Sequence, residues 1–351
     1  MRLSLKAIVF ASLAIALAPA ACGSAHRDRP LEGFGADTPG GAGGATYSVT
    51  SLADSGPGTL RDALSSSNRD ISFAVGGTIT LAATIRVSGH HITVDASTAP
   101  APGITITGAA GVTGPLVEVK QGHDVILRHL RFRDAPDPST GDNLRIWDGA
   151  YNVVVDHCSF RRAGDGNLDI SDGAHDVTVQ WCILAQTVKN SLIRTGVSRL
   201  SLHHNLFVQG DERNPQLDDA TAVDMVNNVI YDWAGNYGTR LRNGASANIV
   251  ANSYVVGPRS DAQDALVLMA DVGAVYIAGN TLPPACQVVG TTTVRLPAPS
   301  VAEMTAQAAL RAVLDEAGAA PRDDEDAAYT AIVAANPVAP LSWGALKAMF
   351  K

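Results

Sequence analysis

The chain has 351 residues, of which 46% are hydrophobic and only 5% aromatic, and it contains 33 glycines. Its formal net charge of −8 argues against nucleic acid as a partner and against general electrostatic capture of an anionic polymer, so an anionic ligand would need a local basic site. A core of aliphatic side chains with many glycine turns suits a solenoid, which grows by adding coils within one long domain.

The first 21 residues have the pattern of an export signal. Arg2 and Lys6 precede the apolar run 7–18, and residues 18–20 form an A-x-A cleavage site. This run is too short for a lasting membrane span, so we expect a secreted, periplasmic or cell-surface protein without a transmembrane segment. Cys22 also resembles the cysteine of a bacterial lipoprotein, which leaves a lipid anchor open.

After a linker over residues 22–30, glycine-rich turns lead into a short amphipathic helix at residues 59–65. Leu60 and Leu64 lie four residues apart and therefore share a helix face, and we expect this helix to cap the open end of the solenoid. Alternating apolar and polar residues predict the first strands, at residues 71–75, 78–81, 84–87 and 91–94.

Seven ten-residue phrases repeat along the middle of the chain, with starts 23 to 28 residues apart. They begin at His123, Tyr151, His175, Ser198, Thr221, Ala245 and Gly273. The third and fifth positions are apolar in every copy, which is the period of a strand with one buried face. Self-similarity at this period, without helical periodicity, indicates a solenoid.

Two columns of side chains identify the kind of solenoid. Position ten stacks large apolar residues, and position eight carries Asn205, Asn228, Asn252 and Asn280. A column of asparagines after a strand is typical of a tight turn at which side-chain amides bond from coil to coil. We therefore predict an all-β chain, a right-handed single-stranded parallel β-helix over residues 31–290.

Two cysteines share position eight in the phrases before the asparagine column. Cys158 and Cys182 would lie on adjacent coils, close enough either to form a disulfide or to stack as two buried thiols. The spacing leaves both interpretations open. Cys286 has no obvious partner.

The pattern changes in a C-terminal extension, residues 291–351. Residues 300–317 and 323–335 are rich in alanine and place apolar residues at helical spacing. We expect two helices packed along the side or end of the β-helix, with no chemistry of their own.

The phrase register also aligns a set of charged residues. Asp142, Asp165, Lys189 and Arg213 lie eight to ten residues before successive phrases. Coils stack about 4.8 Å apart, so we expect these side chains to form a line on one outer face. Asp169 follows Asp165 by an even number of residues and can point the same way. Three neighbouring carboxylates repel one another unless they bind a cation, and an all-oxygen ligand set favours Ca²⁺.

Each of these residues also has a purely structural interpretation. Asp165 and Asp169 are compatible with a solvated turn, and Lys189 alone with an ordinary surface lysine. Arg213 could pair with a neighbouring acid, Glu212 or Asp218. The alignment of all these groups on successive coils is what favours a functional site.

The repeat, together with the segments VVDHCSF, DGNLDI and ERNP, resembles the pectate lyases of polysaccharide lyase family 1 over about residues 31–290. The resemblance implies Ca²⁺-dependent β-elimination of polygalacturonate on a parallel β-helix. It also implies roles for individual residues. The calcium ligands would be Asp142, Asp165 and Asp169, the substrate-binding lysine would be Lys189, and the proton-abstracting arginine would be Arg213 of the R-x-P segment.

Two positions depart from the family pattern. Thr140 stands where the family has a further acidic residue, and Asp218 stands where it has a second arginine that binds a substrate carboxylate. Arg240 and Arg242 lie one coil further on, and we consider them the candidates to bind substrate in its place.

Two other functions compete with the lyase. A β-helical glycoside hydrolase, such as a polygalacturonase, would need paired carboxylates as general acid and base, whereas Lys189 and Arg213 in line with the acids favour elimination. A non-catalytic carbohydrate-binding β-helix is the third possibility, supported by Thr140 and Asp218. For the favoured lyase the expected partner is an acidic, polygalacturonate-like polysaccharide, and we expect a monomer.

Overall fold

The computed structural model describes residues 29–235 and 237–336. The predicted export signal and Cys22 lie outside these residues, so the structure does not bear on them. Within the described part, no helix is long and apolar enough to cross a membrane.

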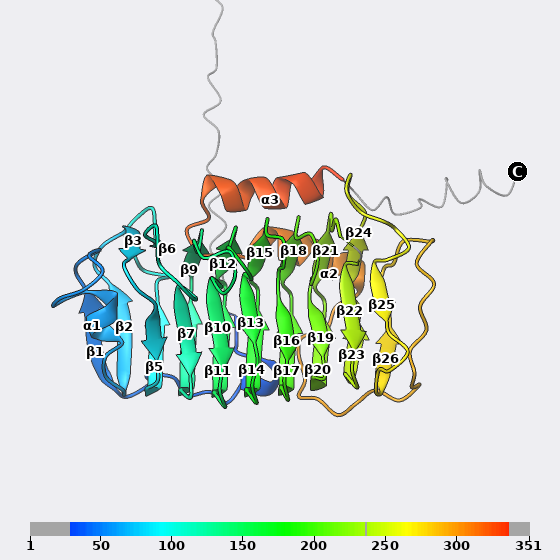
Figure 1. Cartoon of the computed structure of the whole chain (residues 1–351), viewed down its shortest axis with the longest axis horizontal. Helices are drawn as coiled ribbons and strands as arrows, with labels where there is room; N and C mark the ends of the chain where they lie inside the picture. Colours follow the sequence, from blue (N-terminus) through cyan, green and yellow to red (C-terminus); the bar gives the residue numbers. More distant parts are fainter. Residues whose placement is uncertain (1–28, 236, 337–351) are drawn as a thin grey trace, which may run out of the picture.

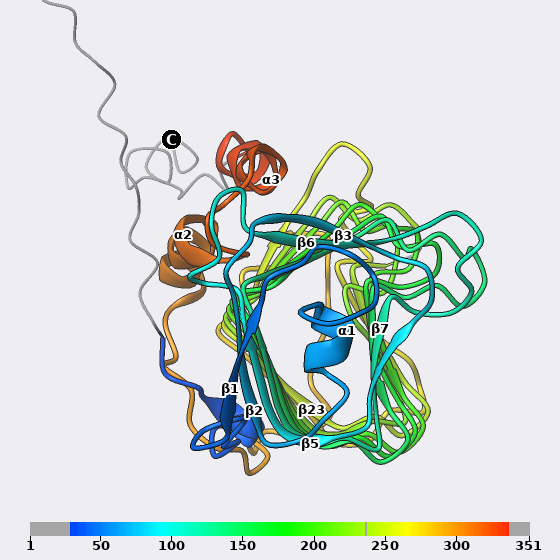
Figure 2. The same ribbon diagram turned by 90° about the vertical axis from the view of Figure 1, so that its left-hand side faces the viewer.

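The strands wind into a stack of coils with three walls, each wall a parallel sheet (Figures 1 and 2). Successive phrases of the sequence occupy neighbouring coils. Each of the first six phrases supplies one strand to the ten-stranded sheet and one to a second sheet, whereas the last phrase supplies β26 and an isolated bridge at Thr281. The predicted parallel β-helix is confirmed.

The three walls are named sheets A, B and C. Sheet A contains β1 (Ala45–Val49), β2 (Arg69–Phe73), β5 (His90–Asp95), β8 (His123–Arg128), β11 (Tyr151–Asp156), β14 (His175–Gln180), β17 (Ser198–His203), β20 (Thr221–Val226), β23 (Ala247–Val250) and β26 (Val275–Ala278). Sheet B contains β3 (Gly77–Leu81), β6 (Ile104–Gly108), β9 (Leu130–Arg133), β12 (Ser159–Arg161), β15 (Ile183–Ala185), β18 (Leu206–Val208), β21 (Val229–Tyr231) and β24 (Ser253–Val255). Sheet C contains β4 (Ile85–Val87), β7 (Val117–Lys120), β10 (Leu144–Trp147), β13 (Leu168–Ile170), β16 (Leu192–Arg194), β19 (Gln216–Asp218), β22 (Thr239–Arg242) and β25 (Leu266–Leu268).

The core fills the inside of the coils with the columns that the repeat predicts. Val153 and Val155, at the third and fifth positions of one phrase, are fully buried. At position ten, Phe132 and Phe160 stack with ring centroids 5.0 Å apart and nearly parallel planes. Identical positions therefore pack against one another along the axis, and burying each such side chain contributes roughly 1.5–3 kcal/mol.

The predicted asparagine column forms a hydrogen-bonded ladder at the turn between sheets A and B. In Asn205, Asn228 and Asn252, the main-chain N–H and the side-chain amide both donate to Oδ1 of the next asparagine, at 2.8–3.0 Å. The ladder begins at Asn205, whose Oδ1 accepts from the N–H of Cys182 at 2.9 Å. Cys158 and Cys182 continue the column as two buried free thiols, so the disulfide is not formed.

A short helix closes one end of the coil stack. Helix α1 (Leu60–Ala63) lies across the open end in Figure 2, with Leu60 and Ala63 buried. Thr59 caps the helix by accepting a hydrogen bond from the N–H of Asp62 at 3.2 Å. The predicted cap is confirmed, although the helix is shorter than residues 59–65. A 3₁₀ turn, η1 (Gly33–Gly35), packs on sheet A.

Two helices lie against the outside of sheet B, and α3 runs along the stack in Figure 1. They are α2 (Ala306–Glu316) and α3 (Asp324–Ala334), both shorter than the predicted segments. Val313 and Tyr329 pack on apolar side chains of sheet B. Buried Arg133 of β9 bonds to Asp323 at 2.8 Å and Asp326 at 3.0 Å, which fixes the start of α3.

The buried pair His203 and His204 predicts acid sensitivity. Burial, and then the charge of His204, lower the pKa of His203 to about 3, while burial lowers the pKa of His204 to about 4. In the unfolded chain the imidazole pKa values are near 6.5, so below this pH the unfolded state binds protons that the folded state does not bind. The free energy of unfolding therefore falls as pH falls from 6.5 toward 4. We expect His203→Gln to flatten this slope by up to about 1.4 kcal/mol per pH unit, as measured by urea unfolding at pH 7 and pH 5.

Glutamine is the appropriate replacement because Gln180 pairs with His203 from the preceding coil. An unchanged slope in the variant would show that other groups dominate the acid transition.

Candidate active site

The charged residues singled out by the sequence lie at the entrance to sheet C. Asp142, Lys189 and Arg213 each stand in the turn from sheet B, shortly before a strand of sheet C begins. Asp165 lies in the same kind of turn, and Asp169 is inside β13. Four successive coils, those of β10, β13, β16 and β19, thus contribute to a single surface.

A second asparagine ladder holds this entrance in place. The amide of Asn143 donates to Asn167 at 2.8 Å, that of Asn167 to Asn190 at 2.9 Å, and that of Asn190 to Asn214 at 2.8 Å. All four side chains are buried. Three of them directly follow Asp142, Lys189 and Arg213, so the ladder fixes the backbone beside each charged residue. The sequence analysis missed this column, although its spacing of 24, 23 and 24 residues was available as a signal.

The predicted alignment is wrong by one residue at two places. Isolated bridges pair Lys189 with Gly166 on one side and with Glu212 on the other. Asp165 therefore lies one residue before the line, and Arg213 one residue after it. The second offset arises because Arg213 adopts a left-handed backbone, with φ 62°, immediately before the ladder residue Asn214.

Two carboxylates are held close together by the main chain. The N–H of Gly166 donates to Oδ1 of Asp142 at 2.9 Å, and the N–H of Leu192 donates to Oδ1 of Asp169 at 2.9 Å. A Cβ atom at Gly166 would lie 2.8 Å from both Oδ1 atoms, so these oxygens are separated by no more than twice that distance. Glycine at position 166 leaves room between the two acids for a small ligand.

This arrangement raises the free energy of the ionised form of both acids. Burial, followed by repulsion from Asp169 and Asp165, raises the pKa of Asp142 to about 9. Burial also raises the pKa of Asp169 to about 6, while the N–H of Leu192 and the charge of Arg213 act in the opposite direction. A divalent cation would neutralise both acids, so the donor chemistry fits an oxygen-liganded ion such as Ca²⁺.

Asp165 does not complete a closed ligand set in this structure. Its Oδ1 accepts a hydrogen bond from Nζ of Lys189 at 2.6 Å. Within the described residues, the ligand oxygens of Asp142, Asp165 and Asp169 are not all within 4.8 Å of one another. Asp165 is therefore paired with the predicted substrate-binding lysine, and it would have to change partner to become a third metal ligand.

Arg213 has the only weak ion pair of the group. Its Nε lies 3.6 Å from Oε1 of Glu212, and this buried Nε has no hydrogen-bond partner in the part of the chain that the structure describes. The pairing with Glu212 that the sequence left open is present, but it is long. The guanidinium also interacts with the side chain of Tyr237, so Glu212 is not its only partner among the described residues.

Arg145 is a functional candidate that the sequence analysis missed. It pairs in register with Asp169 across β10 and β13, and its charge opposes the rise in the pKa of both Asp142 and Asp169. Its guanidinium lies 4.4 Å from the centre of the Trp147 ring. The available signal was its place in β10, which matches that of Asp169 in the next coil.

The two candidate substrate-binding arginines are both engaged by neighbours. Arg242 forms an ion pair with Asp218 at 2.6 Å. Arg240 donates to Gln216 at 2.6 Å and lies 3.9 Å from the centre of the Tyr237 ring. Asp218, the departure from the family pattern, is therefore neutralised by an arginine of the next coil rather than left as a free negative charge.

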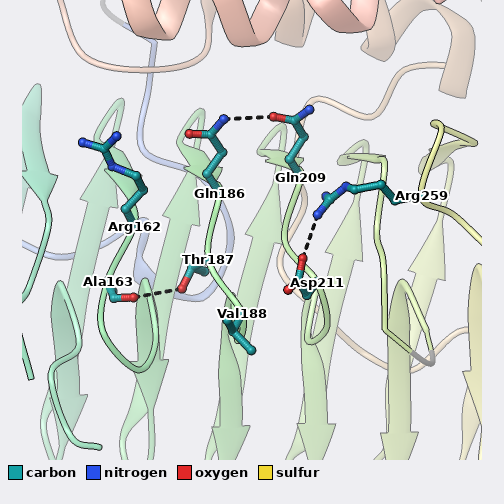
Figure 3. A pocket seen from close by; sticks show the side chains of 8 residues that line it. All are labelled: Arg162, Ala163, Gln186, Thr187, Val188, Gln209, Asp211 and Arg259. Atoms are coloured by element: carbon teal, nitrogen blue, oxygen red, sulfur yellow. Dashed lines mark hydrogen bonds and ion pairs between the residues drawn. The ribbon is translucent and has the colours of Figure 1, made fainter. Parts of the chain in front are cut away.

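A surface recess of about 490 Å³ borders the turns that carry the site residues (Figure 3). Its lining consists of Arg162, Ala163, Gln186, Thr187, Val188, Gln209, Asp211 and Arg259. Gln186 donates to Gln209 at 3.1 Å and Arg259 to Asp211 at 2.7 Å, so much of its polar surface is already paired. None of the site residues proposed from the sequence is part of this lining, and we assign the chemistry to the entrance of sheet C instead.

Asp142→Asn tests whether the crowded acids destabilise the folded protein when no cation is bound. Because the pKa of Asp142 is raised to about 9 from its ordinary 3.8, the folded state loses stability as pH rises through this window. The asparagine keeps the acceptor for Gly166 but carries no charge. We expect the variant to melt a few degrees above wild type at pH 8 with chelator, since about 1 kcal/mol shifts Tm by roughly 2–4 °C.

The same variant should lose most of the stabilisation that Ca²⁺ gives to wild type. Differential scanning calorimetry with Ca²⁺ and with chelator measures both effects, and equal calcium stabilisation of both proteins would contradict the assignment.

Comparisons with known proteins were consistent along most of the chain. The family model described as pectate lyase matches residues 23–321. A probable pectate lyase C from Aspergillus terreus is 36% identical over 235 residues, which are 65% of this chain and 54% of that protein. A pectate trisaccharide-lyase from a Thermotoga species is 28% identical over 162 residues, 42% of each chain. The chain thus spans about half the length of the curated relatives it matches.

Solved structures share the fold at low sequence identity. Jun a 1, the major allergen from cedar pollen, superimposes with a TM-score of 0.70 at 19% identity, covering 82% of this chain and 92% of that one. A pectate lyase from a Bacillus species, in complex with trigalacturonate, gives a TM-score of 0.63 at 20% identity, covering 82% and 98%. These likenesses show the parallel β-helix.

Proposed function

Because the chain belongs to the pectate lyase family, we propose that it is a Ca²⁺-dependent polysaccharide lyase that cleaves polygalacturonate or a related acidic polysaccharide by β-elimination. The observation that carries the proposal is the pair of crowded carboxylates, Asp142 and Asp169, beside Lys189 and the weakly paired Arg213 on the next coils. We further propose that the protein acts outside the cytoplasm as a monomer, with residues 1–21 as its export signal.

The reaction requires a proton to leave the carbon next to a uronate carboxylate. The electron pair then forms a carbon–carbon double bond, and the glycosidic C–O bond on the neighbouring carbon breaks. When bound, Ca²⁺ would neutralise the substrate carboxylate and so acidify that proton. Asp142, Asp169 and, after release from Lys189, Asp165 would hold the ion.

The cations of the chain position the substrate and receive the proton. The Lys189 ammonium, once it leaves Asp165, would bind a substrate carboxylate as a compact point charge. Arg213 would accept the proton, either as a transiently neutral guanidine or through a bound water, since a guanidinium is ordinarily always protonated. Nε of Arg213 lies 3.6 Å from Oε1 of Glu212, so this acid is the group that would hold the guanidinium beside the substrate.

Arg213→Ala should nearly abolish the reaction without unfolding the protein. Loss of a positioned proton acceptor lowers kcat by about 10²–10⁴-fold. The assay is the ultraviolet absorbance of the unsaturated product formed from polygalacturonate, with Ca²⁺ and then with chelator. Arg199→Ala is the matched control, because Arg199 is an exposed arginine of sheet A paired with Asp176, and it should leave the rate unchanged. Wild-type activity in Arg213→Ala would remove this residue from the mechanism.

Lys189→Ala should weaken substrate binding more than it slows the chemical step. A hydrogen bond to a charged group contributes about 1.5–3 kcal/mol, so KM should rise by roughly 10–100-fold. Steady-state kinetics on oligogalacturonates separate KM from kcat. A loss of kcat with KM unchanged would instead assign Lys189 to the transition state.

One observation favours a second function, hydrolysis. The buried carboxyl group of Asp142, held close to the second carboxyl group of Asp169, resembles the paired acids of a glycoside hydrolase. The absorbance assay decides between the two, because a hydrolase releases reducing ends without an ultraviolet-absorbing product. Polymer binding with neither signal would support a non-catalytic carbohydrate-binding protein.

A further inference from the structure

A histidine cluster lies on sheet A. This sheet contributes no residue to the candidate active site at the entrance to sheet C. It consists of His91 in β5 and of His123 and Asp124 in β8, two strands that pair side by side. One ligand atom from each of these three residues lies within 4.8 Å of the others, an arrangement that no other histidine, cysteine or acidic group of the described residues shows. Nothing in the proposed lyase mechanism uses it.

The cluster is built around one fixed carboxylate. Asp124 is buried, and its Oδ1 accepts a hydrogen bond from the amide of Asn152 at 2.9 Å. Its Oδ2 lies 2.7 Å from Nδ1 of His123 and 3.8 Å from Nε2 of His91. The two imidazoles are partly exposed, so an ion in solvent can reach the oxygen that they share.

We propose that His91, His123 and Asp124 form a binding site for a divalent transition-metal ion of the Zn²⁺ class. Two imidazoles and one carboxylate are a ligand set that Zn²⁺ prefers, with a solvent molecule in the fourth position. Zinc binds these atoms at about 2.0–2.2 Å, which requires ligand atoms some 3–4 Å apart. The 3.8 Å pair meets this requirement, and the 2.7 Å contact of His123 opens when the metal replaces its shared proton.

His90 prepares His91 to act as a ligand. Nδ1 of His90 lies 2.9 Å from Nδ1 of His91, a contact that needs a proton on one of the two nitrogens. With the proton on His91, its Nε2 presents a lone pair toward Asp124. A metal-bound histidine commonly donates its other N–H to a neighbouring side chain or carbonyl in this way. His90 also stacks on His123, with ring centroids 5.1 Å apart, and so restricts its orientation.

The chain contains a close copy of this arrangement that lacks the third ligand. His175 and Asp176 in β14 repeat the pair of His123 and Asp124, at 2.8 Å. There Arg199 donates to Asp176 at 2.6 Å and lies 3.0 Å from Nδ1 of His175. A permanent cation thus neutralises that carboxylate, whereas the first pair faces the imidazole of His91. The copy is a built-in control for metal binding.

A metal at this site would join two neighbouring coils near the capped end of the solenoid. Since β5 and β8 belong to successive coils, the bound ion would link chain segments about 30 residues apart and stabilise the folded state by mass action. The proposal is independent of the lyase activity, because the site does not contain Asp142, Asp165 or Asp169.

The test is titration of the full-length, chelator-stripped protein with Zn²⁺ by isothermal calorimetry, with Ca²⁺ present to occupy any oxygen site. We expect one ion per chain, binding at least tenfold more weakly in His91→Ala and in Asp124→Asn. His175→Ala and Asp142→Asn should bind as wild type does. Co²⁺ should give the visible absorption of a tetrahedral nitrogen and oxygen site in wild type and not in His91→Ala.

Several outcomes would overturn the proposal. They are an absence of Zn²⁺ binding by folded wild type, unchanged binding in both His91→Ala and Asp124→Asn, and a loss of binding in Asp142→Asn or His175→Ala. Circular dichroism of each variant in chelator shows whether it is folded. His123→Gln serves if His91→Ala is not, and it should bind at least tenfold more weakly.

Discussion

The structure depends on hydrogen bonds that run from each coil to the next. Every strand pairing in the three sheets is parallel and joins neighbouring coils, and two asparagine ladders extend this bonding through the turns. A buried turn has main-chain groups that need partners, and an asparagine amide can both donate and accept. Repeating the residue in four successive coils therefore satisfies the main-chain groups of those turns, and it fixes the place of each turn residue relative to the next.

That rigidity allows the protein to hold like charges together. Asp142 and Asp169 cannot move apart, because each accepts a hydrogen bond from the main chain of the neighbouring coil. Burial, together with repulsion from the neighbouring acids, raises the pKa of both carboxyl groups, and Arg145 compensates for only part of this rise. This crowding is compatible with the proposed Ca²⁺ site, and it is possible because the ladder beside it fixes the backbone.

Much of the fold could be predicted from the sequence because its cause is local. A period of two within each phrase sets the buried face, and the repeat of the phrase sets the stacking, so the sheets, the first asparagine column and the cap at Leu60 followed directly. The second ladder was missed because the phrases were aligned on sheet A and end before Asn143 and its equivalents. The same alignment also hid Arg145.

The sequence by itself therefore determined the architecture and most, though not all, of the charged residues that gather at the entrance to sheet C. Only the tertiary structure decided their partners. Asp165 pairs with Lys189, Arg242 with Asp218 and, over a longer distance, Arg213 with Glu212. It also decided that Cys158 and Cys182 remain thiols. The reason is that spacing counts residues, whereas turns of unequal length and a single left-handed residue absorb one position without disturbing the strands on either side. A shift of one residue in the register between coils therefore changes which side chains meet.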